Sequence, residues 1–180
     1  MRNIIIFLFL LITPLKAENV FPLDPAINYG KLENGLTYYI RENSTPKDKV
    51  VMRLFIKTGS VMEEEHQRGL AHLIEHMAFN GSKNFPKKKI DEYLSSIGLN
   101  LGSHYNAHAS FFETVYKFEI PTDDIKNVET AIQILADIAK NLDLTPEAFE
   151  RERKIVEEEY RTDIGSDKRY YDELSKFTFK

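Results

Sequence analysis

The segment Arg68–Ser82 constrains the fold of this chain more than any other stretch. It carries two histidines four residues apart, His72 and His76, with Glu75 between them. In a helix these three side chains lie on one face, because residues three and four apart are neighbours. The rest of the segment is apolar, so the helix is predicted to be buried with its narrow polar stripe facing a cleft. The Asn80-Gly81 pair is typical of the end of a helix.

Two imidazoles one helical turn apart can share a tetrahedral zinc ion through ring nitrogens at about 2.0–2.1 Å. A structural role is the more frequent interpretation for a single buried histidine, but three convergent ligand-type side chains favour a metal site. The chain has no cysteine, so a zinc site here must use imidazole and carboxylate groups. His72 and His76 supply two ligands, and a catalytic zinc needs a third from the protein.

A second helix is predicted to begin at Thr145-Pro146 and to run to about Thr162, and it is rich in carboxylates. Spacing does not choose the third ligand among them. Glu152 and Glu159 are seven residues apart and therefore share a face of this helix. A solvated helix face is the simpler interpretation for most of the other acids.

The motifs beyond the histidine segment resemble those of the pitrilysin/insulinase family of zinc peptidases, in which His-x-x-Glu-His is the inverted zinc motif. The resemblance runs from about Tyr29 to Asp163. The matching residues are Gly59-Ser60, Glu63, Gly69 to His72, Glu75 to Met77, Phe79, Gly81-Ser82, Asn106-Ala107, Glu113 to Tyr116 and Glu152 to Glu159.

The resemblance implies one zinc ion per chain, bound by His72, His76 and Glu159. It implies that Glu75 takes a proton from the metal-bound water and delivers it to the leaving amine. Glu152 is expected to support the site from behind the ligands.

The resemblance also implies a peptide substrate. In the family, the strand that corresponds to 103–110 pairs with an extended peptide, and Asn106 and Ala107 match that substrate-binding pattern. The family closes two related halves around the peptide, and this chain resembles the N-terminal, catalytic half. The peptidase domain 18–180 is therefore expected to be incomplete at its C-terminal end and to need a second homologous half or a partner subunit.

Two functions follow from these expectations. The first is a zinc-dependent endopeptidase that hydrolyses extended peptides with a metal-activated water. The alternative is a non-hydrolytic zinc-binding fragment or subunit, acting as a peptide-binding or partner-docking module. Zinc stoichiometry does not separate the two functions, because both predict about one ion per chain.

The fold is predicted to be α+β, with a mostly antiparallel sheet and helices packed on one face. Hydrophobic residues make up 42% of the 180 residues, which is enough for one compact core. A helix is expected from a Thr122 cap to about Asn141. Its predicted core stripe is Ile125, Val128, Ile132, Leu135 and Ile138. The other predicted elements are a hairpin over 29–41, a strand over 50–58, a helix over 86–97 and paired strands over 101–110 and 112–120.

Residues 1–17 are predicted to be a secretory signal peptide, with Arg2 before an apolar centre at Ile4–Ile12. This apolar centre is shorter than the roughly 20 residues that span a bilayer, and an uncleaved anchor is the alternative. The chain is therefore expected to be exported, to a periplasm or outside the cell, without stable membrane insertion after cleavage. Its net charge of −4 gives no electrostatic footprint for nucleic acid.

Overall fold

The computed structural model of the protein describes residues 22–86, 88–163, 165, 169–170 and 173–174. The chain divides into two compact units, 1–45 and 46–180. The signal peptide predicted at residues 1–17 lies outside the described residues. No helix among the described residues combines the length and the apolar character needed to cross a bilayer.

The described part of the first unit is a β-hairpin. Strands β1 (Ile27–Lys31) and β2 (Thr37–Arg41) pair antiparallel along their whole lengths. Gly35 in the turn has a φ of 90°, which glycine adopts without strain, as expected for an Asn-Gly turn. The hairpin forms a two-stranded sheet of its own, whereas the sequence predicted one sheet with the later strands. Alternation predicts that a segment is a strand, but it does not specify the partner strand.

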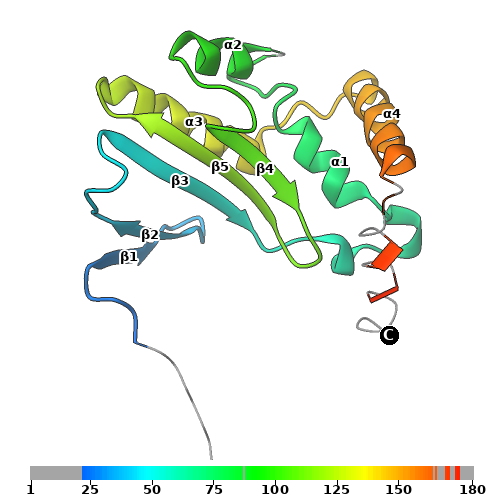
Figure 1. Ribbon diagram of the computed structural model, residues 1–180, viewed down its shortest axis with the longest axis horizontal. Coiled ribbons are helices and arrows are strands. Elements are labelled where there is room, and N and C mark those ends of the chain that lie inside the picture. Colours follow the sequence, from blue (N-terminus) through cyan, green and yellow to red (C-terminus); the bar gives the residue numbers. More distant parts are fainter. Residues whose placement is uncertain (1–21, 87, 164, 166–168, 171–172, 175–180) are drawn as a thin grey trace, which may run out of the picture. The chain divides into compact units, whose positions relative to one another are not determined.

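The second unit is built on a three-stranded antiparallel sheet with the order β3-β5-β4 (Figure 1). The long strands β3 (Lys49–Ile56) and β5 (Thr114–Pro121) pair along their full lengths. Strand β4 (Tyr105–Ala109) pairs with β5 and forms an edge of this sheet. One face of β5 consists of the buried residues Thr114, Tyr116, Phe118 and Ile120, and Val115 on the other face is buried as well.

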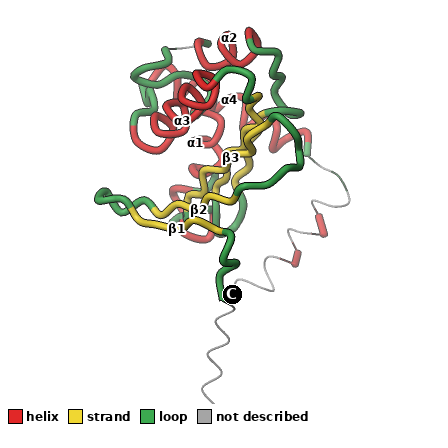
Figure 2. The backbone as a smooth tube through the Cα atoms, turned by 90° about the vertical axis from the view of Figure 1, so that its left-hand side faces the viewer, coloured by secondary structure: helices red, strands yellow, loops and turns green. Residues whose placement is uncertain are grey.

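The helices of this unit lie on one face of the sheet (Figures 1 and 2). The main core is formed between the sheet, α2 and α3, and α1 packs against α4 in a smaller apolar cluster. The fold class is therefore α+β with helices on one face, as predicted. The helices are η1 (Ser60–Met62), η2 (Glu65–Gln67), α1 (Leu70–Met77), α2 (Lys89–Ser96), α3 (Ile125–Lys140) and α4 (Pro146–Thr162).

Helix α3 differs from its prediction in both its cap and its buried face. Its N-cap is Asp124, whose carboxylate accepts a hydrogen bond from the Lys126 N–H at 2.9 Å, and the cap is not Thr122. Two residues of the predicted core stripe, Ile125 and Ile132, are 67% and 56% exposed. The buried face of α3 includes polar residues, and a prediction based on the spacing of apolar residues does not include them. The buried residues are Asn127, Ala131, Ile134, Asp137 and Ile138.

Candidate metal centre

An apolar seam between α1 and α4 brings the predicted site residues together. Leu73 and Met77 of α1 pack against Ala148 near the start of α4. The two helices lie side by side in Figure 1. The polar stripe of α1 carries His72 and His76, and the later turns of α4 carry Glu152 and Glu159. The seam is therefore the local reason why residues more than seventy positions apart in sequence share one site.

Three side-chain atoms form a nearly equilateral triangle at this site. The Nε2 atoms of His72 and His76 lie 3.1 Å apart. The Oε2 atom of Glu159 lies 3.6 Å from the first of these nitrogens and 3.4 Å from the second. Ligands of a tetrahedral ion with bonds of about 2.0–2.1 Å are separated by roughly 3.3 Å. Two imidazoles and one carboxylate are also a donor set that zinc uses, so these residues fit a zinc ion.

His72 is suited to metal binding by its surroundings. Burial lowers the pKa of this ring and His76 acts in the same direction, whereas Glu159 and Glu63 raise it. The net direction is downward, which favours the neutral imidazole. A neutral ring has the free nitrogen lone pair that a metal ion requires.

Glu75 lies beside the triangle and points into the site. Its side chain is 12% exposed, and its Oε2 lies 3.9 Å from Nε2 of His72. Burial raises the pKa of Glu75, while His76 lowers it and Glu159 raises it further. A carboxylate with a raised pKa can accept a proton and then return it more readily than an ordinary glutamate.

Glu152 lies on the other side of the His76 ring. Its side chain is 10% exposed, and its Oε2 is 3.9 Å from the Nδ1 of His76, which is beyond hydrogen-bond distance. The Arg151 guanidinium donates to the second oxygen of Glu152 from Nε at 3.3 Å. The structure thus brings Glu152 next to a predicted ligand, at the ring nitrogen that faces away from Glu159.

Glu63 has a structural role that the sequence reasoning missed. Its Oε2 accepts the Gly69 N–H at 2.8 Å, and its Oε1 accepts the Ala71 N–H at 2.7 Å. These amides belong to the start of α1, where backbone donors lack partners within the helix. Gly69, at the N-cap, has a φ of 88° and contributes no capping side chain. Glu63 is among the residues that match the family, but its position in the sequence did not identify it as the residue that caps α1.

Asn106 and Ala107 lie on the edge strand β4. The His104 C=O accepts a hydrogen bond from the Glu119 N–H at 2.8 Å, and the Ser110 N–H donates to the C=O of Glu113, the residue before β5, at 2.8 Å. In an antiparallel pair, every second residue directs its backbone N–H and C=O toward the neighbouring strand. Asn106 and His108 therefore bond toward β5, and the backbone of Ala107, between them, points to the free edge. The Ala107 N–H is covered by the Asn106 Oδ1 at 2.9 Å.

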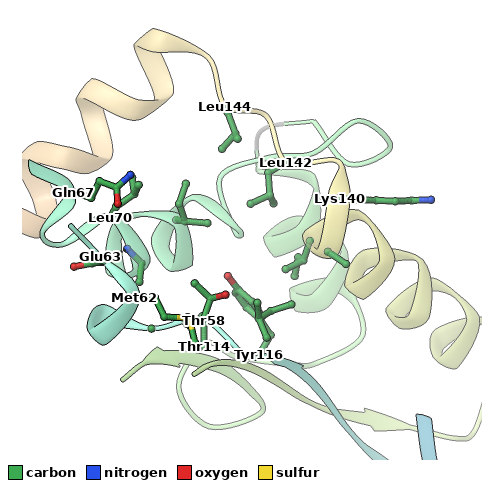
Figure 3. A pocket seen from close by; sticks show the side chains of 16 residues that line it. Thr58, Met62, Glu63, Gln67, Leu70, Thr114, Tyr116, Lys140, Leu142 and Leu144 are labelled. Carbon is green, nitrogen blue, oxygen red and sulfur yellow. Dashed lines mark hydrogen bonds between the residues drawn. The ribbon is translucent and has the colours of Figure 1, made fainter. Parts of the chain in front are cut away.

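A cavity of about 240 Å³ lies between the end of this edge strand and His72. Its lining includes Ala109 at the end of β4 and His72 on α1. A larger cavity of about 450 Å³ lies against another flank of α1, beside Leu70 and Ile74 (Figure 3). The lining of the larger cavity is mostly apolar and contains neither histidine of the triangle. Of these two cavities, only the smaller is lined by a residue of the triangle, His72.

Comparisons with known proteins identify the family of this chain. Residues 38–178 match the family described as Insulinase (Peptidase family M16). The chain is 39% identical over 147 residues to the probable zinc protease PqqL of Haemophilus influenzae, covering 82% of this chain and 16% of that protein. It resembles the crystal structure of the periplasmic protease PqqL from Escherichia coli with a TM-score of 0.79 and 36% identity, covering 84% of this chain and 17% of that one.

The structure of the first half of the Escherichia coli protease is similar as well. It has a TM-score of 0.77 and 36% identity, and the match covers 81% of this chain and 31% of that half. The chain thus spans about a sixth of the length of the Haemophilus influenzae relative, of which it covers 16%. The similarity lies in the N-terminal region of these proteins.

Proposed function

Because the chain belongs to the insulinase family of peptidases, we propose that it carries the zinc site of an endopeptidase that hydrolyses extended peptides with a metal-activated water. The observation that carries this proposal is the triangle of His72, His76 and Glu159, with separations of 3.1 to 3.6 Å. Its dimensions and donor types suit one zinc ion per chain.

The proposed mechanism assigns a separate task to each side chain. His72 and His76 would hold the zinc ion through Nε2, and Glu159 would hold it through Oε2. When bound, zinc would supply a water with a pKa near 7 and a Lewis acid for the scissile carbonyl. Glu75 accepts the proton of that water on its carboxylate and delivers it to the nitrogen of the leaving amine. Glu152, next to the Nδ1 of His76, orients that ring.

The substrate is proposed to be an extended peptide that adds to the edge strand β4. The backbone of Ala107 points to the free edge, so its C=O can accept a hydrogen bond from such a peptide without demanding a particular sequence, and its N–H can donate one once the Asn106 Oδ1 is displaced. Asn106 lies next to this position and covers the Ala107 N–H until the peptide arrives. The cavity of about 240 Å³ between Ala109 and His72 offers room for a substrate side chain beside the metal.

A second candidate function takes account of the share of its relatives that this chain matches. The match covers 31% of the first half of the Escherichia coli protease, so most of that half has no counterpart here. The alternative is a zinc-binding fragment or subunit that does not hydrolyse peptides by itself. It would act as a peptide-binding or partner-docking module, together with a second homologous half or partner subunit.

We also propose that residues 1–17 are a signal peptide and that residues 18–180 belong to the peptidase domain. The Escherichia coli protein is described as periplasmic, which supports export of this chain to a periplasm or beyond the cell. Sequencing the N-terminus of the exported chain tests this assignment, and a mature chain that still begins at Met1 contradicts it.

Metal analysis and a peptide-hydrolysis assay test the proposed function. The purified chain is expected to bind one zinc ion, and His72→Gln is expected to abolish binding. His66→Gln is the matched control, because this exposed histidine pairs with Glu64 outside the triangle. Equal zinc content in the two variants would refute the assigned site.

Hydrolysis of an unstructured peptide separates the two candidate functions. Glu75→Gln is expected to keep zinc and to lose cleavage, because the amide cannot accept the proton. Full cleavage by that variant would refute the role of Glu75. If the wild-type chain binds zinc without cleaving the peptide, the non-hydrolytic function replaces the endopeptidase for the chain by itself.

A further inference from the structure

Arg151 connects the two helices of the candidate metal centre. Its Nη2 donates to the Oδ1 of Asn80 at 2.7 Å, and its Nε donates to the Oε1 of Glu152 at 3.3 Å. Asn80 lies just after α1, whereas Arg151 and Glu152 are neighbours on α4. One guanidinium therefore ties the C-terminal end of the histidine helix to the carboxylate beside His76.

The site requires such a connection because its ligands come from different helices. His72 and His76 move with α1, and Glu159 moves with α4. The seam between the helices is apolar, so it supplies no directional bond between α1 and α4. A charge-assisted hydrogen bond has a defined geometry and opposes such a shift. Arg151 lies eight residues before Glu159, which is about 12 Å along α4.

Arg151 also limits the orientation of Glu152. The guanidinium holds one carboxylate oxygen, and the other oxygen then lies 3.9 Å from the Nδ1 of His76. Arginine stays protonated at all physiological pH values, so this contact persists across the working range of a peptidase. The side chain of Glu152 is 10% exposed, which leaves water little room to replace the guanidinium.

We propose that Arg151 is a positioning residue of the metal centre, which holds α4 against α1 through Asn80 and turns Glu152 toward His76. This inference rests on the proposed zinc site. It adds a residue that contacts none of the reacting atoms and acts through the ligands.

Zinc affinity of the full chain tests this role without relying on activity. The zinc dissociation constant is measured by competition with a chromophoric chelator for the wild type, Arg151→Gln and Arg153→Gln, well below the unfolding temperature of each metal-free protein. Arg151→Gln is expected to weaken zinc binding about tenfold, the lower end of the range for groups that orient ligands.

Arg153→Gln is the matched control and is expected to stay within about twofold of the wild type. The Arg153 side chain is 41% exposed, close to the 38% of Arg151, and it forms ion pairs with Glu150 and Glu157 of the same helix. Arg151→Lys keeps the charge but lacks the forked donor geometry, so it is expected to recover part of the affinity.

A double-mutant comparison separates positioning from general destabilisation. In a chain that already carries Asn80→Ala and Glu152→Gln, Arg151→Gln is expected to cause no further loss of zinc affinity. The inference would be overturned if Arg151→Gln weakened zinc binding as much in that background as in the wild type. It would also be overturned if Arg151→Gln alone bound zinc with wild-type affinity. If Arg151→Gln does not fold, Asn80→Ala takes its place as the variant that breaks the connection. It is expected to weaken zinc binding, and wild-type affinity in Asn80→Ala would overturn the inference.

The outcomes for the two proposals are distinct. Failure of the wild-type chain to bind zinc would overturn the proposed function, and this inference with it. Tight zinc binding by both the wild type and Arg151→Gln would overturn this inference alone.

Discussion

Asp137 is a buried carboxylate that connects helix α3 to the loop after α1. It is fully inaccessible to solvent. Its Oδ2 accepts hydrogen bonds from the Ser82 hydroxyl at 2.7 Å and from the Asn84 N–H at 2.9 Å. Its Oδ1 accepts from the Asn84 side chain at 2.8 Å and from Asn141 at 3.0 Å. The path of the chain after the histidine helix thus depends on one ionised group.

The pKa of Asp137 sets the size of this contribution. Burial by itself raises the pKa, but the hydrogen bonds from Asn141, Ser82 and Asn84 outweigh burial and lower it from 3.8 to about 2. At 1.36 kcal/mol per pKa unit, the difference corresponds to about 2 kcal/mol of folding free energy. The folded pKa lies below the unfolded value, so this stability is present at neutral pH. It is lost as the pH falls from about 4 toward 2.

Urea unfolding of the wild type and Asp137→Asn at pH 7, 5, 4 and 3 checks this reasoning. At pH 7 the variant is expected to be less stable by about 2 kcal/mol or more, because an amide NH₂ group replaces one of the two acceptor oxygens. The difference in unfolding free energy between the wild type and Asp137→Asn is expected to shrink at pH 3, because part of the stability from the ionised Asp137 is lost there. Glu129→Gln, at an exposed acid on the same helix, is expected to follow the wild type. A difference between wild type and Asp137→Asn that stays constant from pH 7 to pH 3 would refute the argument.

Three further predictions concern the site. Glu159→Gln is expected to weaken zinc binding at least about tenfold in chelator competition, because an amide is a poorer ligand than a carboxylate. Equal weakening in Glu158→Gln, which alters a residue paired with Arg161 outside the triangle, would contradict this role. Glu63→Ala is expected to lower the unfolding free energy by about 1 kcal/mol in urea, through loss of the α1 cap; an unchanged value would show that water replaces the carboxylate without cost. Ala107→Pro removes an edge N–H, so it is expected to raise the KM for a peptide at wild-type zinc content, and an unchanged KM would exclude pairing at this position.

The local structure of the site was readable from the sequence, because it follows from helix periodicity. His72, Glu75 and His76 share a face of α1 through spacings of three and four residues. The Thr145-Pro146 pair fixed the start of α4, and the Thr145 hydroxyl does accept the Ala148 N–H, at 3.3 Å. Each of these features depends on residues within one or two turns of each other.

The features that the sequence did not determine depend on tertiary contacts. The carboxylates of α4 are equivalent in spacing until the seam with α1 is formed, so family resemblance was needed to select Glu159. The buried face of α3 was misassigned because Asp137 can be buried only with donors such as Ser82, far away in sequence. The cap of α1 was missed for a similar reason, since Glu63 reaches over a 3-10 turn to the helix amides.

The charges around the triangle give an independent argument for a cation. The side chains of Glu75 and Glu152 are 12% and 10% exposed, and Glu159 lies within 4 Å of both rings. Burying carboxylates costs free energy unless positive charge compensates them. Arg151 compensates Glu152 alone among these acids. A divalent ion between the histidines would compensate the other two and hold α4 against α1. Zinc binding and the packing of these helices are therefore expected to be coupled, so that each stabilises the other.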